Sequence, residues 1–360
     1  MNPKGEHKKK LREIKGVGQP KSIQKFDLKR GKLPTTKVFV QHIRKGDISY
    51  LSRAITLVES THINHHKQAA EILQDCLPFA NKSIRIGVTG VPGVGKSTFI
   101  EALGTTLIQQ GKKVAVLAID PSSSINKGSI LGDKTRMEEL VKHKNAYIRP
   151  SPSGDSLGGV ARKTREAIIL CEAAGFDSII VETVGVGQSE TAVHSMVDFF
   201  LLLKLAGAGD ELQGIKRGIM EMADAIVINK ADGTNLKKAN LAKVEFERAL
   251  HLYPPKISQW QPKVTTCSAT ENKGVAEIWE TILSYVDLTK SNNYFQQKRD
   301  EQNKYWVIDT INQELKNKFY NNSEVKKQLK AVLKKVQEFK LTPFEAANNV
   351  LSKYYNKSGE

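Results

Sequence analysis

Seven short apolar runs between residues 84 and 266 constrain the fold of this 360-residue chain more than any other feature. The runs are rich in β-branched residues and do not alternate with polar ones, as is typical of strands buried on both faces. Helix-like stretches separate them, so we expect an α/β fold with a mostly parallel central sheet flanked by helices. The runs are Ile84–Val88, Val114–Ile119, Ala146–Ile148, Ser178–Val181, Phe199–Leu203, Ala225–Ile228 and Val264–Thr266.

A glycine-rich loop at residues 90–97 follows the first run and matches the phosphate-binding pattern GxxxxGK[ST] in full. The helical stretch Thr98–Gln109 comes next, and this context separates a true phosphate loop from a chance glycine-rich turn. Its backbone N–H groups and the helix N-terminus suit phosphate, while Lys96 can reach the β- and γ-phosphates and Ser97 can bind Mg²⁺. We therefore expect a P-loop NTPase domain. Its predicted phosphate-binding residues are Gly90, Val91, Pro92, Gly93, Val94, Gly95, Lys96, Ser97 and Thr98.

A second motif predicts which base is read. Asn229-Lys230-Ala231-Asp232 follows the run Ala225–Ile228, and NKxD at a strand's carboxyl end is the usual guanine reader. The Asp232 carboxylate can accept two N–H bonds that guanine offers and adenine does not. Alone, the motif could instead be a helix cap or turn. The string Ser268-Ala269-Thr270 resembles the loop that contacts the guanine oxygen in many GTPases, so we predict that the ligand is GTP or GDP.

Three carboxylates at predicted strand ends or in nearby loops are candidate Mg²⁺ ligands together with Ser97. Asp120 ends the run Val114–Ile119, Asp133 lies in the loop that follows, and Glu182 ends Ser178–Val181. Carboxylates placed near a phosphate loop commonly hold Mg²⁺ directly or through water. A helix or turn cap is the alternative for Asp120, and a purely structural role is the alternative for Asp133.

The segment after Glu182 bears on the rate of hydrolysis. Many GTPases have DxxG here, and this chain has Glu182-Thr183-Val184-Gly185. Val186 stands where a Ras-like GTPase would place its water-orienting Gln. We therefore expect slow intrinsic hydrolysis unless Gln188 or a partner compensates. Arg136 is only a candidate for a charge-stabilising arginine.

Positive charge is concentrated at the two ends of the chain. The formal net charge is +17, yet residues 51–286 hold 27 basic and 25 acidic residues. A nucleic-acid-binding core would carry a basic face itself, so no nucleic acid partner is expected. We divide the chain into a basic, disordered arm (1–45), an N-terminal helical extension (46–82), the P-loop domain (83–286) and a C-terminal helical arm (287–360). A weak binder of RNA, membrane or an acidic partner is the alternative for the basic arm.

Other features point to the cytoplasm. No apolar stretch approaches the length of about 20 residues that a membrane span needs, and no apolar signal segment is visible, so no membrane contact is expected. The three cysteines lie far apart without a CxxC, which fits a reducing compartment. His62, His65 and His66 predict a polar turn between helices, with a metal site as the alternative.

Several long motifs, in order, resemble the MeaB/ArgK family of GTPase chaperones of methylmalonyl-CoA mutase. Residues 181–190 resemble its switch II, residues 120–123 and 132–137 its switch I, and residues 208–216 its additional switch III. Residues 150–153 and 157–161 fit as well. The similarity covers roughly residues 45–286, while the ends match in character only.

The resemblance implies a SIMIBI-class GTPase that works as a homodimer through its C-terminal arm. It implies a cobalamin-dependent acyl-CoA mutase as partner, with GTP gating adenosylcobalamin loading and protecting the mutase, and a cobalamin adenosyltransferase as a further partner. By the same analogy Asp210, Gln213 and Lys216 relay between nucleotide and partner. The candidate catalytic residues are Lys96, Glu182, Gln188 and Lys216.

Three other functions stay open. A metal-insertion GTPase of the same class would need a Cys/His cluster, for which only the three histidines are available. A targeting GTPase of the signal-recognition type would fit the basic ends but not the switch II string. A kinase acting in arginine and ornithine transport, an older idea about this family, fits the guanine reader poorly.

Overall fold

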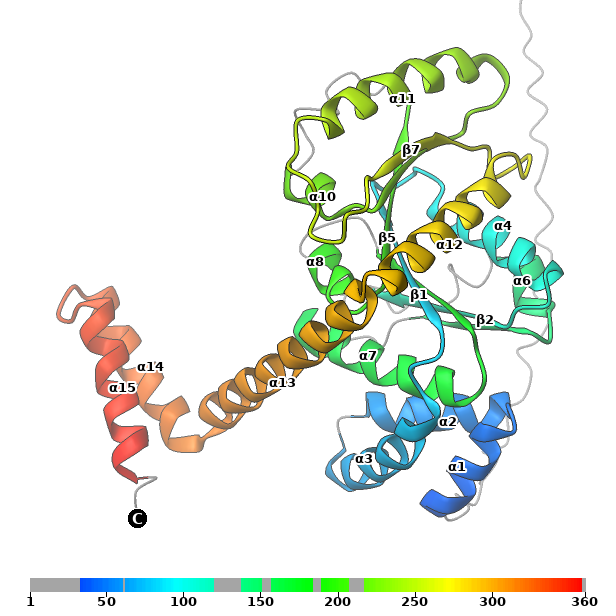
Figure 1. The fold of residues 1–360 in the computed structure, drawn as a ribbon. Coiled ribbons are helices and arrows are strands. Elements are labelled where there is room, and N and C mark those ends of the chain that lie inside the picture. Colours follow the sequence, from blue (N-terminus) through cyan, green and yellow to red (C-terminus); the bar gives the residue numbers. More distant parts are fainter. Residues whose placement is uncertain are drawn as a thin grey trace, which may run out of the picture. The chain divides into compact units, whose positions relative to one another are not determined.

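The computed structural model describes residues 33–60, 62–119, 137–150, 157–183, 189–206 and 217–357 (Figure 1). All described helices and strands belong to one compact unit, Thr36–Glu360. None of these helices is long and apolar enough to cross a membrane.

Seven strands form one sheet in the order β3-β2-β4-β1-β5-β6-β7, and every neighbouring pair is parallel. Each strand coincides with one of the seven apolar runs, extended by at most two residues. The parallel α/β architecture expected from the sequence is therefore confirmed. The strands are β1 Ile84–Gly90, β2 Val114–Ile119, β3 Ala146–Arg149, β4 Ser178–Thr183, β5 Phe199–Leu205, β6 Ala225–Asn229 and β7 Lys263–Thr266.

The strand order reverses at β1, which lies between β4 and β5. In open α/β sheets, ligands bind outside the carboxyl ends of the strands at such a point. The register sets Val88 beside Glu182 of β4 and Gly90 beside Leu203 of β5. The phosphate loop that follows β1 and the carboxylate of Glu182 therefore share one edge of the sheet.

Helices cover both faces of the sheet because the strand side chains are apolar on both. Ile179 and Val181 of β4 join the core under α7 and the N-terminal helices, while Ile180 joins the core under α4 and α12. A third cluster lies between α11 and the β5–β7 part of the sheet (Figure 1). The helices are α4 Lys96–Gln109, α6 Glu138–Lys142, α7 Leu157–Ala173, α8 Ser189–His194, α10 Arg217–Met222, α11 Leu236–Leu250 and α12 Val275–Ser291, with a 3₁₀ turn at Gly233–Asn235.

From residue 33, where the described part of the chain begins, three helices precede the sheet: α1 Thr36–Arg44, α2 Ile48–Glu59 and α3 Ile63–Cys76, with a 3₁₀ turn at Leu77–Phe79. We expected a disordered arm up to residue 45, but residues 36–44 at its end form the helix α1. Phe39 and Ile43 account for the difference, because both are fully buried in the core that α1 shares with α2, α3 and α7. Residues 1–32 lie outside the described part of the chain.

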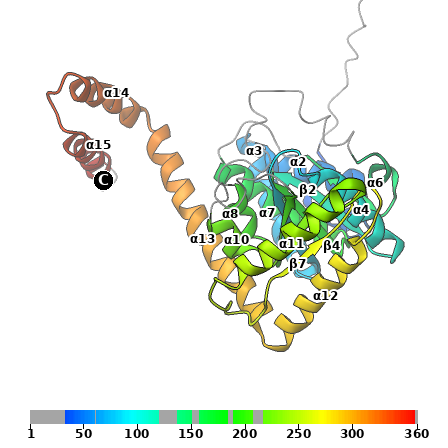
Figure 2. The same cartoon turned by 90° about the horizontal axis from the view of Figure 1, so that it is seen from above.

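The C-terminal extension is helical, as expected, and consists of α13 Tyr294–Asn321, α14 Ser323–Gln337 and α15 Pro343–Lys357 (Figure 2). The anticipated boundary between residues 286 and 287 falls inside α12, whose Tyr285 and Val286 belong to the core of the sheet domain. α13 contacts α12 and α7, and α14 contacts both α13 and α15. Several apolar side chains of this extension are exposed, among them Ile308, Leu315 and Phe344.

Candidate functional site

The phosphate loop joins the carboxyl end of β1 to the first turn of α4. Gly90, Gly93 and Gly95 have positive φ angles of 155°, 81° and 94°, a region that residues with a Cβ rarely enter. At Gly95 a Cβ would also lie 2.7 Å from Nδ2 of Asn229. Glycine at this position therefore gives the loop its conformation and lets the side chain of Asn229 approach.

Lys96 is buried, and its ammonium group lies against the loop backbone. Nζ donates hydrogen bonds to the carbonyl oxygens of Gly90 at 2.8 Å and Val91 at 3.3 Å. Val91, Pro92, Gly93 and Thr98 are exposed, so the outer rim of the loop is open to solvent. A lysine held in this position has its charge next to the N-terminus of α4, where phosphate oxygens are favoured.

The hydroxyl of Ser97 lies 3.5 Å from Oε1 of Glu182, at the limit of a hydrogen bond. Beneath this pair, Thr183 Oγ1 donates to Thr89 Oγ1 at 2.9 Å and ties the ends of β4 and β1 together. A hydroxyl and a carboxylate are the hard oxygen ligands that Mg²⁺ prefers. The two residues thus fit a magnesium ion, with room in the ligand set for phosphate oxygens and water.

The predicted base-reading loop contacts the phosphate loop directly. Asn229 Nδ2 donates to the carbonyl oxygen of Val94 at 2.8 Å, and Lys230 Nζ donates to that of Gly93 at 3.0 Å. Lys230 has φ +59°, the left-handed conformation that turns its side chain back from the end of β6. Two sequence motifs separated by more than 130 residues are therefore in direct contact.

Asp232 and the Ser268-Ala269-Thr270 string also come together, as expected for one base-reading site. Oδ2 of Asp232 accepts hydrogen bonds from Ser268 Oγ at 2.6 Å and from Thr270 Oγ1 at 3.4 Å. These donors hold the carboxylate in one orientation while its oxygens retain further acceptor capacity. Such a carboxylate can accept the paired N–H groups of a guanine ring.

Sequence reasoning missed Cys267, which helps to hold Asn229. Its thiol donates to Asn229 Oδ1 at 3.3 Å, and the backbone N–H of Ala269 donates to the same oxygen at 3.4 Å. Burial raises the pKa of Cys267 to about 12, so the thiol stays protonated and can donate. Its position immediately before Ser268 was the only available signal.

Four predicted site residues lie outside the described part of the chain: Asp120, Asp133, Gln188 and Lys216. The same holds for Arg136, Asp210 and Gln213. Among the described residues, the predicted phosphate-binding, base-reading and Ser97–Glu182 groups share the edge of the sheet at which β1, β4, β6 and β7 end. This arrangement combines a phosphate cradle, a pair of metal-binding oxygens and an acceptor for a purine ring.

Comparison with known proteins identifies the family. The model of the family described as "Methylmalonyl Co-A mutase-associated GTPase MeaB" matches residues 51–324. The chain is 46% identical to GTPase ArgK of Escherichia coli K12 over 304 residues, covering 84% of this chain and 92% of ArgK. It is 43% identical over 323 residues to the mitochondrial methylmalonic aciduria type A homolog of Mus musculus, covering 87% and 78% of the two chains.

A solved structure agrees with the sequence matches. The crystal structure of a LAO/AO transport system kinase superposes with a TM-score of 0.72 at 39% identity, covering 89% of this chain and 97% of that one. The similarity therefore extends over nearly the whole of both chains. Together with the matched family model, it shows that this chain belongs to the MeaB family of SIMIBI-class P-loop GTPases, which bind guanine nucleotide and hydrolyse GTP.

Proposed function

We propose that this GTPase is a chaperone of a cobalamin-dependent acyl-CoA mutase, methylmalonyl-CoA mutase or a close relative. GTP binding and hydrolysis would gate the loading of adenosylcobalamin and protect the mutase from inactivation. The observation that carries the proposal is the match of residues 51–324 to a family described by its association with that mutase. The mitochondrial relatives, described as methylmalonic aciduria type A homologs, point to the same metabolism.

We assign the nucleotide contacts to the groups that meet at the edge of the sheet. The loop from Gly90 to Thr98 would hold the phosphates, with the Lys96 ammonium on the β- and γ-phosphates. Asp232 would read the guanine ring, and the backbone of residues 268–270 would contact its oxygen. The hydrogen bond from Asn229 to the Val94 carbonyl oxygen supports this assignment, because it fixes the base-reading loop relative to the phosphate loop.

Mg²⁺ would be held by Ser97 and Glu182, with Asp120 and Asp133 as further ligands. The ion would neutralise charge that develops on the transferring phosphate. Glu182, Gln188 and Lys216 are proposed to act with Lys96 in catalysis. Because Val186 stands where Ras-like enzymes have Gln, intrinsic turnover should be slow, and the partner should accelerate it.

The C-terminal helices are proposed to form a homodimer. Apolar side chains at positions 308, 311 and 315 of α13 are spaced to lie along one side of the helix and are about half exposed or more. A second copy of this chain could cover them. Cobalamin adenosyltransferase is a further proposed partner, and the cytoplasm is the proposed location.

The metal-insertion alternative has little support in the described residues. His62 caps α3, His65 Nδ1 contacts the Ser60 hydroxyl at 2.8 Å, and His66 Nε2 contacts the Ser60 carbonyl oxygen at 3.0 Å. Within the part of the chain that the structure describes, no three His, Cys, Asp or Glu residues are grouped to hold a metal ion. The three histidines thus form the polar start of a helix.

Cofactor transfer tests the chaperone proposal. Apo-mutase would be mixed with adenosylcobalamin in the presence of this protein with GTP, with GDP, or with Lys96→Ala protein and GTP. We expect loading to depend on the nucleotide with the native protein, and this dependence to vanish with Lys96→Ala. If adenosylcobalamin loading depends on neither the nucleotide nor this protein, the chaperone role is overturned, while the GTPase assignment stays intact.

A further inference from the structure

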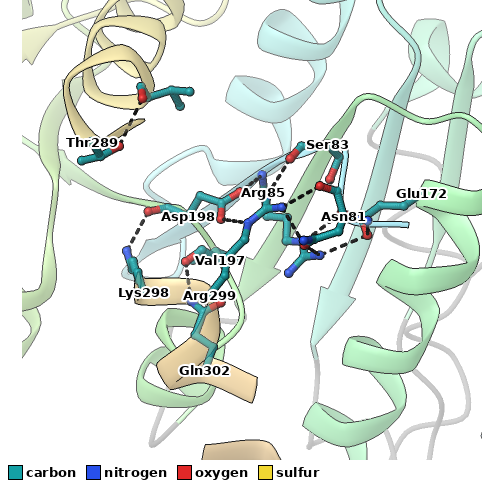
Figure 3. Close-up of polar contacts among 11 residues, drawn as sticks. Asn81, Ser83, Arg85, Glu172, Val197, Asp198, Thr289, Lys298, Arg299 and Gln302 are labelled. Carbon is teal, nitrogen blue, oxygen red and sulfur yellow. Dashed lines mark hydrogen bonds and ion pairs between the residues drawn. The ribbon is translucent and has the colours of Figure 1, made fainter. Parts of the chain in front are cut away.

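Buried polar side chains on α13 face the connection between α8 and β5. Lys298, Arg299 and Gln302 are each less than 10% exposed, although they belong to a helix whose later apolar residues are exposed. Trp306, one turn further along, is also buried. Figure 3 shows Lys298, Arg299 and Gln302 directed toward Val197 and Asp198 at the amino end of β5.

The contacts hold the backbone of residues 195–198 at three carbonyl oxygens. Trp306 Nε1 donates to Ser195 O at 3.0 Å, Gln302 Nε2 to Val197 O at 2.8 Å, and Lys298 Nζ to Asp198 O at 2.6 Å. The three donors are four residues apart, so they lie on one side of the helix in successive turns. α13 therefore holds three of the four residues of the connection between α8 and β5.

Arg299 extends this attachment to the start of β1. Its guanidinium donates two bonds to the Asp198 carboxylate, at 2.8 and 2.6 Å, and others to Asn81 and to the Ser83 carbonyl oxygen. Burial would raise the pKa of Asp198, but the bonds and charge of Arg299 outweigh it, so the pKa is lowered. The backbone N–H of Arg85 donates to the same carboxylate at 2.8 Å. An ionised, fully paired aspartate thus joins α13 to β1 and β5.

At its other end, the connection continues into α8, which leads to the edge of the sheet shared by the phosphate loop and Glu182. α8 starts at Ser189, and Ser189 and Glu190 belong to the string 181–190 that resembles switch II. The helix is closely packed on β1: a Cβ at Gly87 would lie 2.9 Å from side-chain carbons of Val193 and Val197. A six-residue helix spans only about 9 Å, so a shift at its first residue reaches residues 195–198 with little to absorb it.

We infer that α13 is a positioning element of the GTPase reaction: through Gln302, Trp306 and Arg299 it fixes residues 195–198 and α8, and so couples the C-terminal helices to the switch II segment. The coupling goes beyond the proposed function, since it holds for any client that binds the C-terminal helices. Separating a buried ion pair leaves an uncompensated buried charge, which is strongly unfavourable, so the Arg299–Asp198 pair resists any displacement of α13 from β5. Such a contact suits an element that must transmit position.

Two conservative substitutions test the inference. Gln302→Leu removes the amide that bonds Val197, and Trp306→Phe removes the N–H that bonds Ser195, while both keep most of the buried volume. Gln297→Leu and Tyr305→Phe are the matched controls, because both side chains are exposed on the same helix. Steady-state GTP hydrolysis would be measured with each full-length protein, together with its thermal unfolding.

We expect the double variant Gln302→Leu/Trp306→Phe to lose about fivefold in kcat with KM for GTP within about twofold, and the controls to match the native protein. Amide exchange supplies a second readout. In the native protein, binding of a non-hydrolysable GTP analogue should alter exchange in both α8 and α13, and the double variant should lose the α13 response while keeping its nucleotide affinity.

An absent α13 response in the native protein would overturn the inference, whether or not the variants fold. So would a double variant with native kcat and a native α13 response, or controls that lose as much kcat as the double variant. Loss of kcat and nucleotide affinity together, with a lowered Tm, would mark these residues as structural only and would also overturn it.

Discussion

The carboxamide of Asn229 donates a hydrogen bond to the carbonyl oxygen of Val94 across 2.8 Å. Together with the bond from Lys230 to Gly93, this contact joins the end of β6 to the phosphate loop after β1. Asn229 does not need to touch the base to matter for binding, because it sets the distance between the two loops that would hold opposite ends of one nucleotide. Cys267 and Ala269 hold its other amide atom, Oδ1.

Asn229→Ala should therefore weaken both GTP and GDP. Removing the side chain leaves the buried Val94 carbonyl without this donor and releases the base-reading loop, at a cost of about 1–3 kcal/mol. That corresponds to a Kd about 5- to 150-fold higher. Titration with a fluorescent GDP analogue measures it, with Asn240→Ala on the exposed side of α11 as control; equal affinities in the two variants would contradict the role of Asn229.

Asp232→Asn should change which base is preferred. Loss of the charged acceptor should raise the Kd for GTP by about 10- to 100-fold and leave xanthosine triphosphate less affected or improved. Ser268→Ala is the informative control, since it removes the 2.6 Å bond that orients the carboxylate and should weaken both nucleotides alike. If Asp232→Asn weakens both nucleotides equally, the carboxylate does not read the base.

Glu182→Gln should alter the dependence on magnesium. The amide keeps the shape of the side chain but removes the negative charge beside Ser97. We expect the Mg²⁺ concentration for half-maximal GTP turnover to rise by about tenfold, which is about 1.4 kcal/mol. Glu280→Gln, exposed on α12, is the control and should leave the magnesium titration unchanged. An unchanged titration for Glu182→Gln would show that Glu182 does not bind the metal ion.

His194 should make the protein less stable as the pH falls. It packs edge-on against Phe200 at 5.5 Å between ring centroids, and its neighbouring charges are Lys298, Asp224 and Lys256. Burial, followed by Lys298, lowers the pKa of His194 to about 4, against an ordinary value of 6.5. Between these values the unfolded chain binds a proton that the folded chain does not, so unfolding becomes easier as the pH falls.

The expected contribution of His194 to this loss is about 2 kcal/mol between pH 7 and pH 5. Urea unfolding of the native protein and of His194→Gln at both pH values measures it. His194→Gln should show a smaller loss of stability on acidification than the native protein. The exposed His251→Gln variant serves as control, and identical pH dependence in all three proteins would show that His194 is not responsible.

The sheet and the contiguous motifs could be predicted from the sequence because each is a local pattern. A strand buried on both faces leaves an uninterrupted apolar run, and a phosphate loop must keep its glycines and lysine at fixed spacing. Helix α1 was missed because only two buried apolar residues, Phe39 and Ile43, mark it within a lysine-rich stretch.

Long-range polar contacts could not be predicted in the same way. Lys298 and Arg299 look like ordinary exposed charges on a helix, and nothing near them in sequence indicates that Asp198, about 100 residues away, is their partner. The same holds for the Asn229–Val94 bond. A charged side chain is buried only where the tertiary fold supplies a partner, so local sequence patterns do not predict which charges are buried.

GTP hydrolysis by the purified protein, alone and with methylmalonyl-CoA mutase, tests the central claim most directly, with ATP and Lys96→Ala protein as controls. The account predicts slow turnover of GTP but not ATP, acceleration by the mutase, and no turnover by the Lys96→Ala variant. Turnover of GTP that the mutase leaves unchanged would contradict the proposed client, and undiminished turnover by Lys96→Ala would contradict the site itself.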